Sequence, residues 1–260
     1  MALSTVALQE HRGSALRGVL IESLRSGFCL LKGQAPEPPC GEVPGCQVCS
    51  LVATPDMQGS RGREVPRPFV LEPPTDSHTT LYAGDTLSFD LLLFGEAVRY
   101  TPYVALALQG IGRLGRTIEE GRSGHVALQS VWAINELSGE AHRVLRGGSM
   151  RIEMPRPGVS HTQALDYAAT LPGDAVEIRL RTPLRLVAAG NLVRQLSFAI
   201  LMRRLVRRLN DLSATYAGGI PAVDFAPLLS QAEAVTILQD RTSWCDVESP
   251  SSRLQRTTPI

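Results

Sequence analysis

The sequence predicts an α+β fold made of two consecutive βαββαβ units, the second short or incomplete. Alternating apolar residues predict strands, and apolar residues at helical spacing predict helices. The first round follows the order strand, helix, strand, strand, helix, strand, which is the ferredoxin-like order that RNA-recognition modules share. The elements expected here are strands at 3–9, 67–74, 86–95, 125–135 and 149–154 and helices at 14–25 and 98–109.

The clearest strand pattern is TLSFDLLLFG, residues 86–95, where Leu87, Phe89 and Leu91 occupy every second position. A side chain at every second position lies on the same face of a strand, so this pattern indicates one apolar face. The segment at 14–25 instead has apolar residues at helical spacing, which indicates a helix that packs through one side.

The second half of the chain is expected to contain more helix. Residues 174–187 alternate like a strand that breaks at Pro183. Helices are predicted at 191–216 and 224–238, separated by glycines that end the first of them. We therefore expect a domain at 1–157 with an excursion rich in Cys, Pro and Gly at 33–66, and a second domain at 158–260 with a helical segment at 191–238.

The composition is that expected of a folded cytoplasmic protein that does not enter a membrane. Hydrophobic residues make up 43% of the chain, which is enough for a core. Glu10 lies where a signal peptide would be apolar, and the apolar runs are too short to span a bilayer. Lys32 is the single lysine, so nearly all basic residues are arginines. A GC-rich genome explains this bias, but arginine also binds phosphate bidentately and stacks on bases.

The segment LALQGIGRLGRTIEEGRSGHVALQ, residues 106–129, combines glycines with three arginines. Glycines let backbone N–H groups approach phosphate oxygens, and guanidinium groups add charged hydrogen bonds. The alternative is a solvated loop whose glycines only close turns, with Glu119 and Glu120 neutralising part of the charge. The arginines predicted to bind RNA here are Arg113, Arg116 and Arg122.

The helix predicted at 191–216 carries a second group of arginines. No acidic residue occurs between Asn191 and Asn210, so nothing local neutralises these charges. Polyanion binding would relieve their repulsion and release counterions, whereas the alternative is a solvated helix face. Leu192, Leu196, Ala199, Ile200 and Leu209 mark the side expected to be buried. The arginines predicted to bind RNA are Arg194, Arg203, Arg204, Arg207 and Arg208, with Arg253 near the end of the chain.

Cysteines gather early in the chain, where two of them form a C-x-x-C motif. A cytosolic setting favours free thiols or a metal site over disulfides. The spacing is irregular and a second C-x-x-C is absent, so no metal is expected, and a structural zinc is kept as the alternative. That alternative would use Cys29, Cys40, Cys46 and Cys49.

Several segments in the same order along the chain resemble the CRISPR repeat-RNA endoribonucleases of the RAMP superfamily. Most of the resemblance lies in GDTLSFDLLLFG and in the glycine–arginine loop that follows it, which is the segment at residues 106–129 described above. The divergent type IV members are the suggested subgroup. The resembling segments are ALRGVLIESL, CQVCSL, RPFVLEPP, GDTLSFDLLLFGEA, PYVALALQGIGRLGR, RLRTPLRL and SWCDVESPSSR.

The resemblance implies two ferredoxin-like RAMP domains, no cofactor, and an activity in CRISPR RNA maturation. Such enzymes bind the repeat hairpin of precursor crRNA and cut it once without metal, leaving a 2′,3′-cyclic phosphate. They retain the mature crRNA and join the subunits of a CRISPR effector complex. Family members usually continue beyond the segment that ends at Ser252 and Arg253, so the second domain here is expected to be short or incomplete.

The residues that would cut RNA depart from the family pattern. Many members use a histidine just after the first helix, but this chain has neither histidine nor tyrosine between Arg12 and Leu71. Arginine does not lose its proton in a protein, so it would hold the phosphate and stabilise developing charge. The catalytic candidates are Arg25, His11 and Lys32.

Two further functions stay open from the sequence. One is a non-catalytic RNA-binding RAMP subunit of an effector complex, which the missing histidine favours. The other is a zinc-stabilised scaffold whose cysteines organise protein contacts. Nucleotide-binding and hydrolase motifs of the G-x-x-x-x-G-K-[ST] and G-x-S-x-G types do not occur in the sequence.

Overall fold

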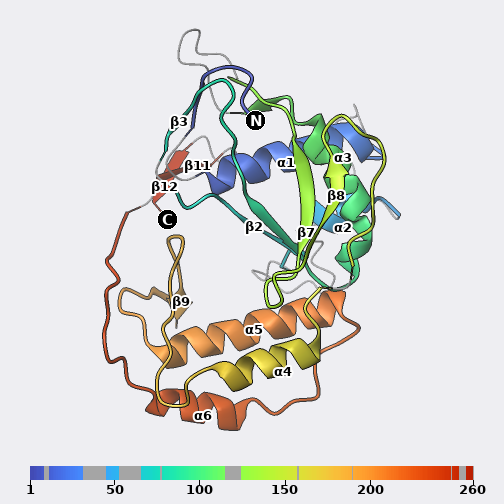
Figure 1. Ribbon diagram of the computed structural model, residues 1–260. Helices are drawn as coiled ribbons and strands as arrows, with labels where there is room; N and C mark the ends of the chain where they lie inside the picture. The colour runs from blue at the N-terminus through green and yellow to red at the C-terminus, as the bar shows by residue number, and fades with distance from the viewer. Residues whose placement is uncertain are drawn as a thin grey trace. The chain divides into compact units, whose positions relative to one another are not determined.

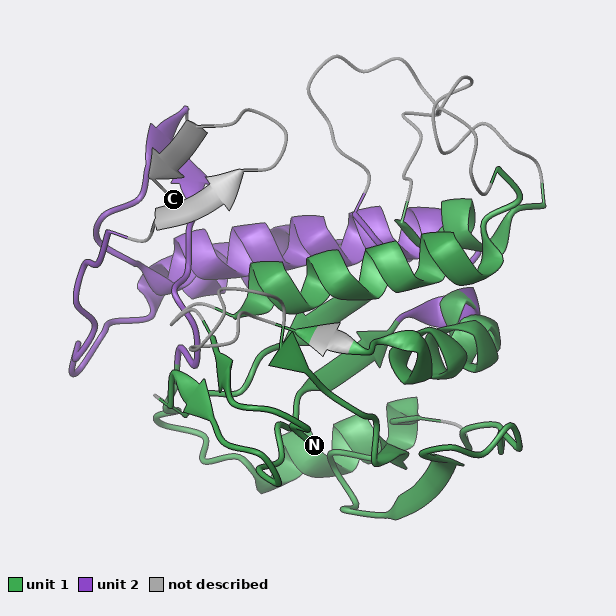
Figure 2. Ribbon diagram, turned by 90° about the horizontal axis from the view of Figure 1, so that it is seen from above, with its two compact units in different colours: residues 1–55, 69–93, 97–179 green, residues 56–68, 94–96, 180–260 purple. Residues whose placement is uncertain are grey.

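The protein has an α+β fold whose chain divides into two compact units, shown in different colours in Figure 2. The first unit comprises Met1–Pro55, Phe69–Leu93 and Ala97–Arg179, and the second comprises Asp56–Pro68, Phe94–Glu96 and Leu180–Ile260. The computed structural model describes residues 1–8, 12–31, 45–52, 66–76, 78–114, 124–156, 158–188, 190–246, 248–251 and 256–259.

Helices and short strands follow one another along the chain, as labelled in Figure 1. The helices are α1 (Gly13–Phe28), α2 (Gln47–Val52), α3 (Thr101–Gly110), α4 (His161–Thr170), α5 (Phe198–Tyr216) and α6 (Ala226–Ala234), with a 3-10 helix η1 (Gly95–Tyr100) before α3. The strands are β1 (Val6–Ala7), β2 (Phe69–Glu72), β3 (Thr80–Leu81), β4 (Asp90–Leu93), β5 (Arg113–Leu114), β6 (Gly124–His125), β7 (Ser130–Ile134), β8 (Ala141–Arg146), β9 (Val187–Ala188), β10 (Asn191–Leu192), β11 (Glu248–Ser251) and β12 (Arg256–Pro259).

Every strand pairing among the described residues is antiparallel and joins two strands. β2 pairs with β4 in the register Phe69 to Leu93, and β2 follows α1 and α2 in the chain. β7 and β8 form a longer hairpin with an irregularity between Val131 and Trp132. The remaining pairs are β1 with β3, β5 with β6, β9 with β10 and β11 with β12.

The core of the first unit lies where α1 packs on α3 and α2. α1 buries Leu16, Leu20 and Leu24, which recur every four residues and therefore lie on one side of the helix. Ser23 Oγ also donates a hydrogen bond of 2.6 Å to the Ala107 carbonyl, which ties α1 to α3. Burial of this apolar face stabilises the unit and fixes α3 beside α1.

Several predicted elements are confirmed, although most strands are shorter than expected. The helix predicted at 14–25 is α1, and the helix predicted at 98–109 is α3 with its preceding 3-10 turn. The strand predicted at 86–95 is confirmed only at its apolar end, as β4. The other confirmed elements lie within the ranges predicted at 3–9, 67–74, 125–135 and 224–238, as β1, β2, β7 and α6.

Two predicted strands are wrong. Residues 174–186 form no strand, because their alternating apolar side chains find no partner strand; Val176 is 55% exposed and Ile178 is 50% exposed. Residues 149–154 contribute a single bridge, from Ile152 to Leu145. The strand that pairs with β7 is instead β8, which the pattern did not predict.

The predicted helix at 191–216 begins later, at Phe198. Gly190 has a φ of 81°, and this left-handed turn joins β9 to β10, so Asn191 and Leu192 are in a strand. Leu192 and Leu196 therefore precede the helix. The side of α5 that was expected to be buried, which was inferred partly from these two residues, is not the side that is buried in the structure. Leu209 is 47% exposed, whereas the buried residues of α5 are Val206 and Leu212.

Part of the predicted domain organisation falls on residues outside the ranges that the structure describes. Of the excursion at 33–66, the described residues form α2 and its flanks, and residues 33–44 and 53–65 lie outside it. The domain boundary at residue 157 stays a prediction. Among the helices described, we found none whose length and apolar character would carry it across a bilayer.

Candidate nucleic-acid interface

Helix α5 carries the main concentration of arginines in the second unit. Ser197 caps it, since its Oγ accepts a hydrogen bond of 3.2 Å from the Ile200 N–H. The helix has no internal glycine or proline and ends before Gly218, which has a φ of 81°. The capped, uninterrupted helix therefore presents its arginines at fixed spacing.

The end of α5 is held against a short segment of the same unit. A Cβ on Gly95 would lie 2.1 Å from the carbonyl oxygen of Tyr216, and Gly95 has a φ of +55°. Only glycine fits there without displacing the helix end. Burial raises the pKa of Tyr216, and the positive charge of Arg208 partly opposes that rise.

Two arginines of α5 have carboxylate partners. Arg203 pairs with Glu233 of α6, and both side chains are 56% exposed. Arg207 Nε lies 4.0 Å from Asp211 Oδ2, one turn along the same helix. Neither pair was expected from the sequence: Asp211 comes just after the stretch without acidic residues, and Glu233 reaches α5 only when α6 packs against it.

The two other arginines of α5 are Arg204 and Arg208. Across the described ranges we found no ion-pair partner for Arg204 or Arg208. They are spaced i, i+4 and so lie one turn apart on one row of the helix surface. Two unneutralised arginines whose Cβ atoms are about 6 Å apart suit successive phosphates of a nucleic-acid strand.

Arg194 lies outside the helix, contrary to the prediction. It follows β10, and its guanidinium carbon is 5.1 Å from the centre of the Trp244 ring. Trp244 Nε1 donates a hydrogen bond of 3.2 Å to Asp246 Oδ1. An exposed arginine stacked on a half-exposed indole is a surface on which a nucleobase can stack.

Most of the glycine–arginine loop lies outside the described residues. The backbone of Arg113 is in β5 and pairs with His125 of β6. Arg116, Arg122 and Arg253 lie outside the described ranges. The prediction that these arginines bind RNA therefore rests on the sequence.

Of the catalytic candidates, Arg25 is described, and His11 and Lys32 are outside the described ranges. Arg25 lies exposed in the last turn of α1. Phe28 follows it by three residues, so both side chains leave the same face of α1. The Phe28 ring packs edge-on against Tyr103, with ring centres 5.3 Å apart. Arg25 is therefore one turn from a residue that contacts the start of α3.

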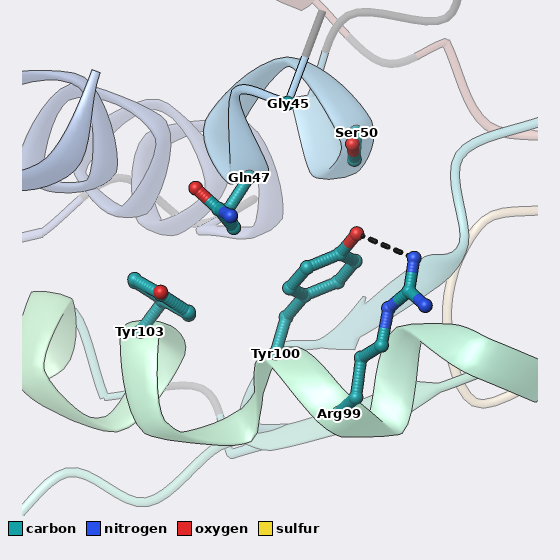
Figure 3. Close-up of a pocket in the computed structure, with 6 residues that line it drawn as sticks. All are labelled: Gly45, Gln47, Ser50, Arg99, Tyr100 and Tyr103. Carbon is teal, nitrogen blue, oxygen red and sulfur yellow. Dashed lines mark hydrogen bonds between the residues drawn. The ribbon is translucent and has the colours of Figure 1, made fainter. Parts of the chain in front are cut away.

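A polar depression of about 530 Å³ lies between α2 and the start of α3, as Figure 3 shows. Arg99 Nη2 donates a hydrogen bond of 2.9 Å to Tyr100 Oη. Its guanidinium carbon also lies 4.9 Å from the centre of the Tyr100 ring. Gln47 and Ser50 face these side chains from α2, and Gly45 and Tyr103 complete the lining. Guanidinium, hydroxyl and amide groups can all donate to an anion such as a phosphate.

Sequence reasoning missed this depression, although RYTPY at 99–103 is a detectable signal. An arginine and two tyrosines at the start of a helix place polar side chains at one helix end. Their partners on α2 come from a segment distant in the sequence, so the sequence does not show which face they share.

The C-x-x-C motif lies at the start of α2, and its cysteines are free thiols. Burial raises the pKa of the Cys46 thiol, but hydrogen bonds from the Leu30 backbone and from Cys49 outweigh it, and the pKa lies below its ordinary value. Within the described ranges, no three His, Cys, Asp or Glu side chains converge as metal ligands would. Cys40 lies outside these ranges, so the zinc alternative stays a prediction.

Part of the chain matches a protein-family model. The family model named AF_1859_N, described as an N-terminal domain, matches residues 1–157. The chain belongs to this family. The AF_1859_N match covers the residues of α1, α2 and α3, which line or adjoin the polar depression. No curated protein and no solved structure matches the chain.

Proposed function

We propose that this protein binds the repeat hairpin of precursor crRNA and cleaves it once, without a metal ion, keeping the mature crRNA afterwards. The observation that carries the proposal is the row formed by Arg204 and Arg208 on α5, whose charges no carboxylate neutralises within the described part of the chain. Such a row favours phosphates held at a regular spacing, as in a paired RNA stem.

The proposed reaction is transfer of a phosphodiester within the RNA. The ribose 2′-oxygen forms a bond to the adjacent phosphorus, and the bond from phosphorus to the 5′-oxygen breaks. The products are a 2′,3′-cyclic phosphate and a free 5′-hydroxyl. Water takes the proton of the 2′-hydroxyl, because arginine keeps its own proton, and a proton is returned to the leaving oxygen.

The side chains around Arg25 support this chemistry in the first unit. Arg25 is exposed, and it is one turn from Phe28, which packs on Tyr103 of the polar depression. A guanidinium there would bind the reacting phosphate and stabilise its developing negative charge. Arg99 supplies a guanidinium to the lining of the depression itself. His11 and Lys32 remain candidates from the sequence alone.

The proposal includes a ferredoxin-like fold for the first unit. Supporting it are the antiparallel pairing of β2 with β4 after α1 and the packing of α1 on α3. An antiparallel bridge from Ala2 to Val126 also joins the beginning of the unit to the segment after α3. For the second unit the ferredoxin-like fold stays a prediction, as do a cytoplasmic location and the effector-complex partners.

The decisive experiment is single-turnover cleavage of a labelled repeat transcript with EDTA present. A cyclic-phosphate product in EDTA supports the proposal, and cleavage that EDTA abolishes contradicts it. Arg25→Ala should slow cleavage while leaving hairpin affinity nearly unchanged. Arg17→Ala is the matched control, since Arg17 is an exposed arginine two turns earlier in the same helix.

A non-catalytic RNA-binding RAMP subunit is the second candidate. The absence of histidine and tyrosine between Arg12 and Leu71 favours it. This subunit would bind the repeat hairpin with salt-sensitive affinity but leave the transcript uncut over long incubations. The same cleavage assay therefore separates the two candidates.

A further inference from the structure

The β7–β8 hairpin presents a face whose aromatic and arginine side chains are not covered within the described structure. Trp132 is 51% exposed and Ile134 is 52% exposed, on alternate positions of β7. Their intervening neighbours face the other way, where Val144 and Leu145 of β8 are buried. The hairpin therefore has one face in the core and one face open.

Trp132 is held in a defined position on the open face. It pairs across the hairpin with Arg143, whose guanidinium carbon lies 5.7 Å from the centre of the indole ring. The indole Nε1 donates a hydrogen bond of 2.9 Å to Ser130 Oγ, two residues earlier on the same face. These contacts orient the ring before any ligand binds, so less side-chain conformational entropy is lost on binding.

The charge around this ring is positive. Arg143 and Arg146 both lie on β8, and neither has an ion-pair partner among the residues described. The sequence contains no aspartate or glutamate from 124 to 135 or from 141 to 152. The acidic residues of the hairpin, Glu136 and Glu140, are confined to its turn, and Glu140 is paired with Arg156. Protein interfaces are also enriched in tryptophan and arginine, so it is the surplus of positive charge, and not the residue types, that favours a polyanionic partner.

We propose that this face is a stacking platform for unpaired nucleotides of RNA. A base would stack on the Trp132 ring, and the adjacent phosphates would contact Arg143 and Arg146. The inference rests on the proposed function, because it assigns to the bound transcript a single-stranded segment beside the hairpin. It adds an RNA-binding site whose chemistry differs from that of the arginine row of α5.

Tryptophan fluorescence tests the stacking directly. The chain has two tryptophans, so Trp244→Phe leaves Trp132 as the only one. Single-stranded RNA should quench the emission of this variant, because a base stacked on an indole quenches it, whereas blunt duplex RNA should not. Emission that single-stranded RNA leaves unchanged, or that duplex RNA quenches equally, would overturn the platform.

Affinity measurements separate this inference from the proposed function. Two RNAs are compared, a repeat hairpin alone and the same hairpin with an unpaired tail. Trp132→Ala should weaken binding of the tailed RNA by about tenfold and leave the blunt hairpin unchanged. Trp132→Phe should retain most of the affinity, and Tyr167→Ala, which removes an exposed aromatic ring from α4, should have no effect.

The outcomes have distinct meanings. If wild type binds neither hairpin but Trp132 still responds to single-stranded RNA, the hairpin proposal fails and the platform stands. If wild type binds both hairpins and Trp132→Ala changes neither affinity, the platform fails and the hairpin proposal stands. Equal loss of affinity for both RNAs in Trp132→Ala would also overturn the platform, since it would indicate general disruption rather than stacking.

Discussion

Arg203 on α5 forms an ion pair with Glu233 on α6, whereas Arg204, the next residue, has no carboxylate partner among the described residues. Both members of the pair are more than half exposed, so the pair itself adds at most about 1 kcal/mol to stability. The pair matters more for RNA binding than for stability, because the Glu233 carboxylate neutralises one arginine of the proposed RNA-binding surface.

Removing the Glu233 charge should therefore strengthen RNA binding. Glu233→Gln frees Arg203 and removes a carboxylate that would repel phosphate, so the hairpin Kd should fall by about twofold to fivefold at low salt. Glu177→Gln is the control, because Glu177 pairs with the exposed Arg179 in another part of the chain. Weaker binding by Glu233→Gln in fluorescence anisotropy would remove Arg203 from the interface.

The stability of the first unit should depend on Arg12. Its side chain is only 3% exposed, and its Nη2 donates to Asp76 Oδ1 at 3.0 Å and to the backbone oxygens of Asp76 and His78. Arg12→Ala removes these contacts and should lower the free energy of unfolding by about 2 kcal/mol, measured by urea denaturation. The exposed Arg17→Ala should change it by less than about 0.5 kcal/mol. Equal stability of the two variants would contradict this role.

The ion pair between Arg12 and Asp76 also predicts that the stability of the protein depends on pH. The hydrogen bond from Arg12, opposed by burial, lowers the pKa of Asp76 below its ordinary value of 3.8. A carboxyl with a lowered pKa in the folded state stabilises the fold above its unfolded pKa, and that contribution is lost as pH falls through the folded pKa. Wild type should therefore be more stable than Asp76→Asn near neutral pH, with the difference shrinking below pH 3.8. A difference that is constant across this range would contradict the assignment.

A pair of glycine substitutions tests how the end of α5 is held. Gly95→Ala forces a Cβ to within 2.1 Å of the Tyr216 carbonyl oxygen at a φ of +55°, and should destabilise the protein by about 2 kcal/mol or more. Gly18→Ala lies in α1 with no atom near its new Cβ, and should stabilise by up to about 1 kcal/mol. Thermal unfolding of both variants gives the comparison. A neutral Gly95→Ala would show that Tyr216 does not contact Gly95 in solution.

A further prediction concerns catalysis. Arg25→Ala should slow single-turnover cleavage by roughly 10²-fold, because a guanidinium that stabilises a developing charge acts mainly in the transition state. Arg99→Ala should slow cleavage less, because the Arg99 guanidinium is already engaged by the ring and the hydroxyl of Tyr100. Arg17→Ala should cleave at the wild-type rate. Loss of hairpin affinity in Arg25→Ala, with an unchanged cleavage rate at saturation, would assign Arg25 to binding instead.

The elements that local periodicity specifies could be predicted, as α1 illustrates. Its leucines recur every four residues and are buried in the structure. The segment at 174–187 failed because alternation is a necessary but not a sufficient condition for a strand. A strand also needs a partner, and the residues at 174–186 have none.

The candidate site was predictable in part for a similar reason. The arginines of α5 are adjacent in sequence, so their proximity follows from helix geometry. The partner of Arg203 and the lining of the depression between Gln47 and Tyr103 come from segments far apart in the chain. Pairings of this kind depend on tertiary packing, which one sequence does not encode in any local pattern.

The salt dependence of hairpin RNA binding tests the central claim most directly. For wild type, the logarithm of the association constant should fall steeply with the logarithm of salt concentration, because bound arginines release counterions. Arg204→Ala combined with Arg208→Ala should weaken binding and reduce this slope by about 1 to 2, whereas Arg179→Ala should leave the slope unchanged. A wild-type protein with no salt-sensitive affinity for the hairpin, or a double variant with the wild-type slope, would contradict the account.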